Sequence, residues 1–251
     1  MRARILVDLE QGTTIMASKP ASAEIHPGPG FRIKNGVQRP SREILEKFGQ
    51  YSTPDVSDLL NRLYAMDGGI RNVVNDQSVV GPALTVKLYP GDNLMLHKAL
   101  DVCHPGDVLV VDTSMNTTTA VIGDLVAAKA KHRGVAGVIV DGLVRDVAAV
   151  KEVGLPIYAR GLTPQGPLHR GPGELGYPVS CGGLVVNPGD IVIADSSGIV
   201  VVRGDFTLEL LDRLEAQALA LKAYVEDVRR GIFSNEWVDK YLLQTSCRVI
   251  D

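Results

Sequence analysis

The sequence predicts an α/β fold with a mixed sheet and a long helix near the C-terminus. Residues 120–160 follow the order helix, strand, helix, strand, which is typical of α/β folds with some parallel pairing. Residues 205–230 carry apolar side chains at steps of three or four, the pattern of one amphipathic helix. Of the 251 residues, 45% are hydrophobic and 22% are charged, which is the composition of a globular protein with a sizeable core.

Arms are expected at both ends of the chain, on either side of one domain. Residues 1–40 are rich in chain breakers, as in the stretch 26–30, and they lack a periodic apolar pattern. We expect a flexible or partner-wrapping N-terminal arm there. The domain is expected over residues 41–231, and a C-terminal arm over residues 232–251.

Two short helices are expected to open the domain. Ser41 precedes apolar residues at helical spacing, and Gly49 ends that helix. In the next helix Thr53 is the expected N-cap and Pro54 the first helical residue, where the missing N–H has no partner to lose. This second helix should end before Gly68.

Strands are expected in the middle of the chain. Pro-Gly-Asp turns at 105–107 and 188–190 precede apolar strands at 108–112 and 191–195. A short apolar run at 137–142, bounded by glycines, indicates a strand buried on both faces.

Helices are expected on both sides of that buried strand. They cover residues 122–130 and 147–153, and the glycines Gly134 and Gly154 stop them. A further strand is expected at 156–159.

Charge, hydropathy and cysteine content exclude several classes of protein. The net charge of −3 argues against a dedicated nucleic-acid surface, which is usually basic. No apolar run approaches the ~18–20 residues of a spanning helix, and the first residues contain no apolar signal region, so no membrane association is expected. Three cysteines without CxxC spacing favour a reducing, cytoplasmic location.

Most familiar catalytic motifs are absent. The chain has no GxSxG, GxxxxGK[ST] or HExxH, and its five histidines show no metal-ligand spacing. One GxGxxG string occurs at 171–176, but no apolar strand precedes it and Pro178 stands where a helix should open. We interpret this string as a loop.

The residues most suggestive of chemistry lie at 123–126 and 145–146. Gly123 and Asp124 begin an expected helix, where backbone amides attract anions and glycine permits close approach. Arg145 and Asp146 follow the buried strand at its carboxyl end, the edge at which α/β sheets bind ligands. This edge could hold a carboxylate substrate on Arg145 and the amides, with a divalent cation on the acids.

A purely structural interpretation exists for each of these residues. Asp146 could be only the N-cap of the following helix. Asp124 could interact only with the helix dipole, and Arg145 could form only a structural ion pair. Spacing by itself leaves both interpretations open.

A set of segments spanning roughly residues 50–230 resembles the RraA-like family. That family includes class II pyruvate aldolases that act on 4-hydroxy-4-methyl-2-oxoglutarate and 4-carboxy-4-hydroxy-2-oxoadipate. Each segment is a weak signal, whereas the whole set in this order is specific. The segments are GDNL at 91–94, PGDVLVVD at 105–112, GDLV at 123–126, GVAGVIVDGLVRD at 134–146, ARG at 159–161 and GPGE at 171–174.

The resemblance implies roles for individual residues. Asp146 would ligate Mg²⁺ or Mn²⁺ directly, and Asp124 would hold metal-bound water. Arg145, with the amides of Leu125 and Val126 after Gly123, would bind the pyruvyl oxygens. Asn93 matches a position that hydrogen-bonds substrate.

The resemblance also implies a three-layer ββα swivelling-domain fold and assembly as a homotrimer or hexamer. In the aldolases a glutamate from the neighbouring subunit's C-terminal helix completes the metal shell. That position falls near Leu221 and Lys222 here, between Glu215 and Glu226, so the third carboxylate is open.

The implied reaction is cleavage of a 4-hydroxy-2-oxo acid to pyruvate and a second oxo compound. The cation and Arg145 would stabilise the developing pyruvate enolate, and a metal-bound water of lowered pKa would protonate its carbon. Oxaloacetate decarboxylation passes through the same enolate and is expected as a side activity. A Schiff-base route would need a buried lysine, whereas Lys87 falls on the polar, solvated face of its expected strand.

The competing interpretation is a non-catalytic binding protein. Some RraA-like proteins regulate RNA-degrading enzymes by binding them, and Asp124 and Asp146 beside Arg145 favour the enzyme. A phosphohistidine domain of similar layout is disfavoured, because no Gly-rich segment leads into Ser/Thr-His.

His169 bears on the choice of substrate. It stands where the aldolases usually have a lysine that would contact a distal carboxylate. An unperturbed histidine is mostly neutral at pH 7, so we expect weaker binding of distal carboxylates. The adjacent Arg170 is an alternative source of the missing charge.

Overall fold

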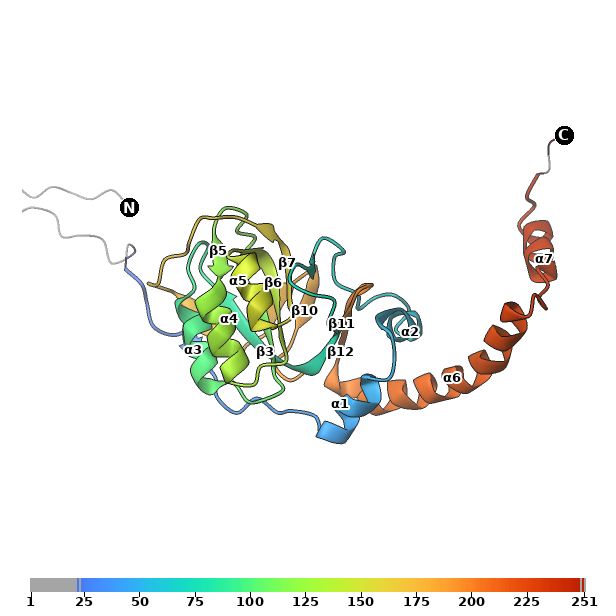
Figure 1. The fold of residues 1–251 in the computed structure, drawn as a ribbon, viewed down its shortest axis with the longest axis horizontal. Coiled ribbons are helices and arrows are strands. Elements are labelled where there is room, and N and C mark those ends of the chain that lie inside the picture. The colour runs from blue at the N-terminus through green and yellow to red at the C-terminus, as the bar shows by residue number, and fades with distance from the viewer. Residues whose placement is uncertain (1–21, 23, 249, 251) are drawn as a thin grey trace, which may run out of the picture.

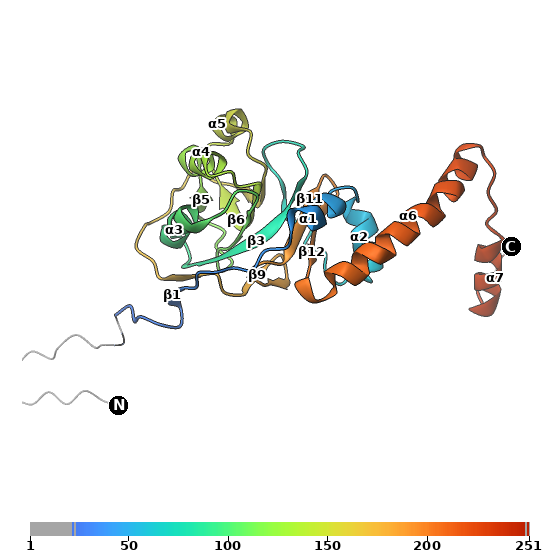
Figure 2. The same cartoon turned by 90° about the horizontal axis from the view of Figure 1, so that it is seen from below.

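The computed structural model describes residues 22, 24–248 and 250. A mixed sheet lies at its centre, three helices cover one face, and a long C-terminal helix leaves the body on the other side (Figures 1 and 2). No helix in the described part of the chain has the length and apolar character to cross a bilayer.

The helices and strands alternate through the middle of the chain. The helices are α1 (Arg42–Phe48), α2 (Thr53–Leu59), α3 (Leu94–Val102), α4 (Asp124–His132), α5 (Val147–Val153), α6 (Thr207–Arg229) and α7 (Glu236–Gln244). The strands are β1 (Phe31–Ile33), β2 (Arg71–Asn72), β3 (Val79–Leu88), β4 (Val108–Asp112), β5 (Ala120–Ile122), β6 (Gly137–Val144), β7 (Ile157–Leu162), β8 (Gly173–Leu175), β9 (Val179–Cys181), β10 (Leu184–Val186), β11 (Ile191–Asp195) and β12 (Gly198–Val202).

Parallel strands form the middle of the sheet. The strand order is β1-β8-β3-β4-β6-β7-β2, and β3, β4, β6 and β7 pair in parallel. Strands β8 and β11 pair antiparallel with β3, and β12 extends β11. The predicted mixed sheet is therefore confirmed.

Three apolar clusters show how the layers pack. The first lies between α3, α4 and α5 and one face of the sheet, and it includes Leu96, Leu109 and Val140. The second lies between the opposite face and the β9 to β12 strands. The third packs α1, α2 and the start of α6 on β11 and β12. This is the expected ββα arrangement, with α6 as the long C-terminal helix.

Local sequence signals account for most helix ends. The Ser41 side chain accepts a hydrogen bond from the Ile44 amide, as expected of an N-cap. In α2 the cap is Ser52, which forms a capping box with Asp55, so the assignment to Thr53 was wrong by one residue. Thr53 instead binds the Asp195 carboxylate through its amide and hydroxyl.

Two expectations about loops differ from the structure. The end of the 171–176 string forms β8, which pairs with β3 and β1, so the interpretation as a loop was wrong there. Part of the expected N-terminal arm also joins the sheet, because β1 pairs with β8 in parallel register. The Arg39 guanidinium then binds the buried Asp107 carboxylate with both its Nε and Nη2. Residues 1–21 and 23 of the expected arm lie outside the described residues.

A row of charged side chains crosses the sheet on the face covered by β9 and β10. From β1 to β6 register pairing places these residues side by side on neighbouring strands, and an ion pair joins Asp141 on β6 to Arg160 on β7. From β1 to β7 they are Arg32, Glu174, Lys87, Asp112, Asp141 and Arg160.

Ion pairs and backbone amides stabilise the charges of this row. The Lys87 Nζ lies 2.6 Å from Asp112 Oδ2, so Lys87 is paired and not simply solvated as predicted. The Arg160 guanidinium binds Asp141, and this hydrogen bond raises the pKa of Arg160 above its ordinary value. The amides of Ser180 and Gly182 donate to Asp112 and Asp141, which ties the β9 strand to the sheet.

Replacement of Asp141 by alanine should destabilise the fold by about 2 kcal/mol, because it leaves the Gly182 amide without its acceptor and leaves the partly exposed Arg160 guanidinium with Asp67 as its remaining carboxylate partner. Urea unfolding at one fixed protein concentration measures this change. Asp58→Ala is the matched control, since its ion pair with Arg62 is exposed and should be worth under about 1 kcal/mol. Equal unfolding midpoints for the two variants would show that the row of charged side chains does not contribute to the free energy of unfolding.

Candidate active site

A cavity of about 230 Å³ lies where α3 and α4 begin, beside the end of β6. Four chain segments that are remote in the sequence line it. Seven of the predicted site residues are among those that line it, namely Asn93, Gly123, Asp124, Leu125, Val126, Arg145 and His169. Asp146 contacts this set through Arg145, whose Nε lies 3.2 Å from Asp146 Oδ2.

The first turn of α4 forms one wall of the cavity. Gly123 occupies the N-cap position in an extended conformation and has no side chain to cap the helix. Asp124 Oδ1 accepts a hydrogen bond from the Leu125 amide at 2.8 Å. The Leu125 amide therefore donates to Asp124 in this structure, and its binding of substrate oxygens stays a prediction.

Asp146 has a left-handed backbone, with φ 57° and ψ 34°, and its side chain makes no capping hydrogen bond to α5. The interpretation of Asp146 as a simple N-cap is therefore wrong. A non-glycine residue in this conformation costs of order 1 kcal/mol, and such strain clusters at functional sites.

Two glycines make room for this Arg-Asp pair. A Cβ atom on Gly123 would stand 2.5 Å from Asp146 Oδ2 and 3.2 Å from Arg145 Nε. A Cβ on Gly166 would collide with Arg145 Nη1. Arg145 thus lies between two backbone segments that approach it closely because neither carries a side chain.

Asn93 positions His169. The Asn93 amide nitrogen donates to the Val121 carbonyl at 2.9 Å, which directs its oxygen toward His169 Nδ1 at 2.6 Å. His169 Nδ1 must then carry the proton, since the Asn93 oxygen only accepts. Asn93 lines the cavity but is almost fully buried, and both polar atoms of its side chain are bound by other residues of the protein.

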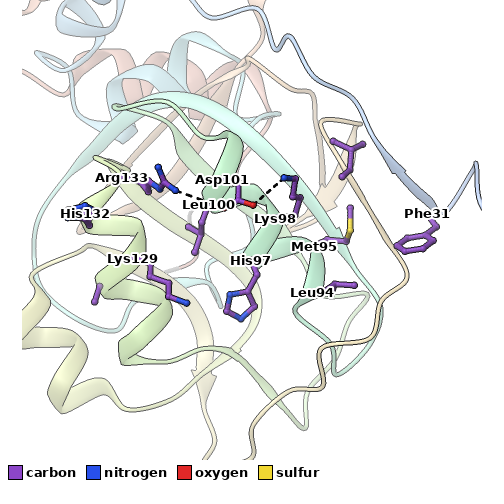
Figure 3. Close-up of a pocket in the computed structure, with 12 residues that line it drawn as sticks. Phe31, Leu94, Met95, His97, Lys98, Leu100, Asp101, Lys129, His132 and Arg133 are labelled. Carbon is purple, nitrogen blue, oxygen red and sulfur yellow. Dashed lines mark hydrogen bonds and ion pairs between the residues drawn. The ribbon is translucent and has the colours of Figure 1, made fainter.

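His97 and Lys129 also line the cavity and were missed by the sequence analysis. Each lies four residues after a predicted site residue, Asn93 or Leu125, so helical spacing was the available signal. The His97 ring meets the His169 ring edge-on with centroids 5.4 Å apart. Figure 3 shows His97 on α3 and Lys129 on α4, on either side of the space between the helices.

The basic side chains His97, Lys129 and His169 give this cavity positive charge. Burial, then the positive charges of Lys129 and His169, lower the pKa of His97 below its ordinary value. Arg170 is not among the described residues that line the cavity. Its backbone amide donates a hydrogen bond to the Asp92 carboxylate. Lys129 therefore stands in a better position than Arg170 to bind a distal anionic group.

The carboxylates fit a hard divalent cation. Asp124 lines the cavity, and the Asp146 carboxylate lies against Gly123, the neighbour of Asp124. Among the described residues no three His, Cys, Asp or Glu side chains form a group that could hold a metal ion. Magnesium usually binds through one or two carboxylates and keeps several waters, so these two donors match its requirements.

The pKa of His97 should rise in the variant Lys129→Met, because this change removes a positive charge that disfavours imidazolium. An NMR titration of the His97 ring proton measures the midpoint, which should lie below about 6.5 in the unmodified protein. Lys131→Met on the same helix is the control, since the Lys131 Nζ binds the Gly154 carbonyl instead of lining the cavity. A midpoint equally shifted by both variants would contradict the cationic cluster.

Comparisons with known proteins agree with this fold. The chain is 38% identical over 160 residues to a protein of Halalkalibacterium halodurans named "Putative 4-hydroxy-4-methyl-2-oxoglutarate aldolase", which covers 64% of this chain and 76% of that protein. A protein of Ectopseudomonas mendocina with the same name is 34% identical over 152 residues, 60% of this chain and 93% of its own.

A solved structure shares the fold as well. RraAS2 of Streptomyces coelicolor, described as an unusual member of the RNase ES inhibitor RraA family, superposes with a TM-score of 0.66 at 31% identity. The match covers 76% of this chain and 98% of RraAS2. The family model described as RraA-like, Aldolase/RraA, matches residues 53–201, which contain the cavity and both acidic residues. The chain therefore belongs to the RraA-like family.

Proposed function

We propose that the protein is a divalent-metal-dependent aldolase that cleaves a 4-hydroxy-2-oxo acid into pyruvate and a second oxo compound. The observation that carries this proposal is the meeting of Arg145 and Asp124 at one cavity beside the α4 N-terminus, with Asp146 in contact with Arg145. The names of the two aldolase relatives support the reaction class.

Arg145 would bind the carboxylate of the pyruvyl group. Its guanidinium lines the cavity and is 40% exposed, so it has free donors for a planar carboxylate. The first turn of α4 presents its positive dipole end to the same space. Together these groups would orient the 2-oxo acid and stabilise the negative charge that develops on its keto oxygen.

Asp146 and Asp124 would hold Mg²⁺ or Mn²⁺, with Asp146 as the direct ligand. The cation would supply Lewis-acid stabilisation of the enolate. Asp124 would hold the water that returns a proton to C3 after the C3–C4 bond has broken. Oxaloacetate would lose CO₂ through the same enolate, which makes its decarboxylation an expected side activity.

His97, Lys129 and His169 would form the wall that receives the distal half of the substrate. All three line the same cavity as Arg145. Their combined charge favours a substrate with an anionic distal group, with Lys129 as the permanently charged member.

Regulation of an RNA-degrading enzyme by binding is the second candidate function. The similarity to RraAS2, whose description places it in an RNase inhibitor family, supports it. The two functions differ in their need for Asp146, because a binding surface does not require a strained carboxylate beside a cavity.

Chelation should abolish pyruvate release from a panel of 4-hydroxy-2-oxo acids, and Mg²⁺ or Mn²⁺ should restore it. Asp146→Ala and Arg145→Ala should each lower kcat by at least ~10²-fold, since each removes electrostatic stabilisation of the transition state. Arg62→Ala, an exposed arginine in the turn after α2, serves as the control. Undiminished rates in excess EDTA, or in the two site variants, would rule out the proposed mechanism.

The KM of a dicarboxylic substrate should rise between about pH 6 and 8, while the KM of a monocarboxylic analogue stays flat. The reason is that a histidine side chain, unlike a lysine, changes its charge within this pH range. His169→Lys should remove the rise, and steady-state kinetics across this pH range test it. Identical profiles for both substrates would place His169 away from the distal group.

A further inference from the structure

One proton of the proposed cleavage has no acceptor among the groups assigned so far. When the C3–C4 bond of a 4-hydroxy-2-oxo acid breaks, the C4 hydroxyl becomes a carbonyl and must lose its proton. Arg145 only donates hydrogen bonds, and Asp124 and Asp146 are assigned to the cation and its water. A general base that faces the cavity would supply the missing step, and such a base contributes about 10²- to 10⁴-fold to a rate.

His169 has one ring nitrogen held by the protein and the other directed elsewhere. Its Nδ1 lies 2.6 Å from Asn93 Oδ1, which only accepts hydrogen bonds, so Nδ1 carries the proton. In a neutral imidazole of this tautomer Nε2 is an acceptor. Nε2 has no hydrogen-bond partner in the described part of the chain, and His169 lines the same cavity as Arg145.

The backbone fixes the orientation of the Asn93 amide. Its nitrogen donates to the Val121 carbonyl at 2.9 Å, and the reverse orientation would set two oxygen acceptors against each other. Asn93 occupies the N-cap position of α3, yet its side chain makes no capping hydrogen bond to that helix, although asparagine is a preferred cap. Asp92 Oδ1 accepts from the Leu94 amide at 2.7 Å instead. The Asn93 side chain is therefore available to hold His169.

The backbone is also fixed on both sides of His169. Leu168 forms two backbone hydrogen bonds, at 2.8 and 3.0 Å, with residues 91–93 in the turn before α3. The Arg170 amide donates to the Asp92 carboxylate. A side chain held by its neighbours and by its own Nδ1 loses little freedom when it engages substrate.

His97 is the rival base, because it lines the same cavity. Its ring meets the His169 ring edge-on, and no hydrogen bond to another described residue orients it. A catalytic base is commonly oriented by a third group. Of the two histidines, His169 is the one that has such a partner within the described part of the chain.

We propose that His169 is the general base of the cleavage and that Asn93 is its positioning residue, a role that rests on the proposed function. Nε2 takes the C4 hydroxyl proton, the O–H electron pair forms the new C4 carbonyl, and the C3–C4 pair forms the enolate. C3 gains a proton from the water at Asp124, and solvent carries the proton from His169 back to that water. One proton thus moves from O4 to C3, and no further reactant is consumed. The neutral ring takes the proton, whereas an imidazolium can attract a distal carboxylate but cannot act as the base.

Oxaloacetate separates this step from the rest of the mechanism, because its decarboxylation gives the same enolate and has no hydroxyl proton to remove. The second substrate is 4-hydroxy-4-methyl-2-oxoglutarate, the acid in the names of the two relatives. In His169→Gln the kcat of cleavage should fall by at least ~10²-fold, and by at least about tenfold more than the kcat of decarboxylation. His97→Gln should change both by a similar factor. His132→Gln, at an exposed histidine of α4 that does not line this cavity, is the matched control.

His169→Lys separates a base from a charge that only binds substrate. A lysine ammonium is fully charged at neutral pH and has no lone pair to accept a proton. The variant should therefore show the same selective loss of cleavage as His169→Gln, even where it improves the KM of a dicarboxylic substrate.

The Asn93 contact is tested by the tautomer of His169. Two-bond ¹H–¹⁵N NMR spectra at about pH 9, where an ordinary imidazole is neutral, should show the proton on Nδ1 in the unmodified protein. Asn93→Ala should shift the proton toward Nε2 and lower the kcat of cleavage, and Asn93→Asp, which keeps an oxygen acceptor, should restore the Nδ1–H form. Circular dichroism checks that both variants are folded. If neither folds, the spectrum of the unmodified protein decides.

Several results would overturn the proposal. Equal losses of cleavage and decarboxylation in His169→Gln would assign His169 to binding, and a selective loss in His97→Gln alone would make His97 the base. A proton on Nε2 in the unmodified protein would remove the acceptor that the step requires. Release of pyruvate from neither acid in the presence of Mg²⁺ would refute the proposed function, and the role of His169 with it.

Discussion

The row of charged side chains across the sheet is the interaction on which the rest of the structure depends. It runs over six strands, where register pairing places the members from β1 to β6 side by side and an ion pair joins Asp141 to Arg160 on β7. A shift of one residue in any strand would turn its charge into the apolar layer under α3 to α5. The row therefore sets the strand register, and the register decides which residues emerge at the carboxyl end of β6. Arg145 and Asp146 stand there for that reason.

The candidate site combines this rigid edge of the sheet with two glycines that leave space beside it. Gly123 and Gly166 leave the space that Arg145 and Asp146 occupy, and either Cβ would meet them at overlapping distance. The left-handed backbone of Asp146 keeps its carboxylate out of the capping role that its position would otherwise give it. Strain of this kind persists only where the surroundings hold it, and here the ends of β6 and α5 do so.

Much of the site could be predicted from the sequence because its residues lie at the ends of strongly patterned elements. Gly123 and Asp124 open a helix, and Arg145 follows a buried strand, so the expected edge was correct. The assignment of Asn93 to substrate stays a prediction, and in the structure its side chain contacts the Val121 carbonyl and His169. His97 and Lys129 were missed because the sequence pattern of a basic residue on a helix is the same whether its side chain faces solvent or a cavity. The Ser52 cap and strand β8 were misassigned for a related reason, since capping geometry and edge pairing depend on distant segments.

The sequence by itself determined the elements with a clear period, such as β4, β6, α4 and α6, and the α/β class that follows from their order. The local pattern is sufficient to predict these elements, because the spacing of apolar residues indicates whether one face or both faces are buried. Only the tertiary structure decided which charges meet across the sheet, that the segment at 31–39 belongs to the body, and that His97 and Lys129 line the candidate site. These features join residues separated by tens of positions, and their pairing depends on how the layers pack rather than on any local preference of the chain.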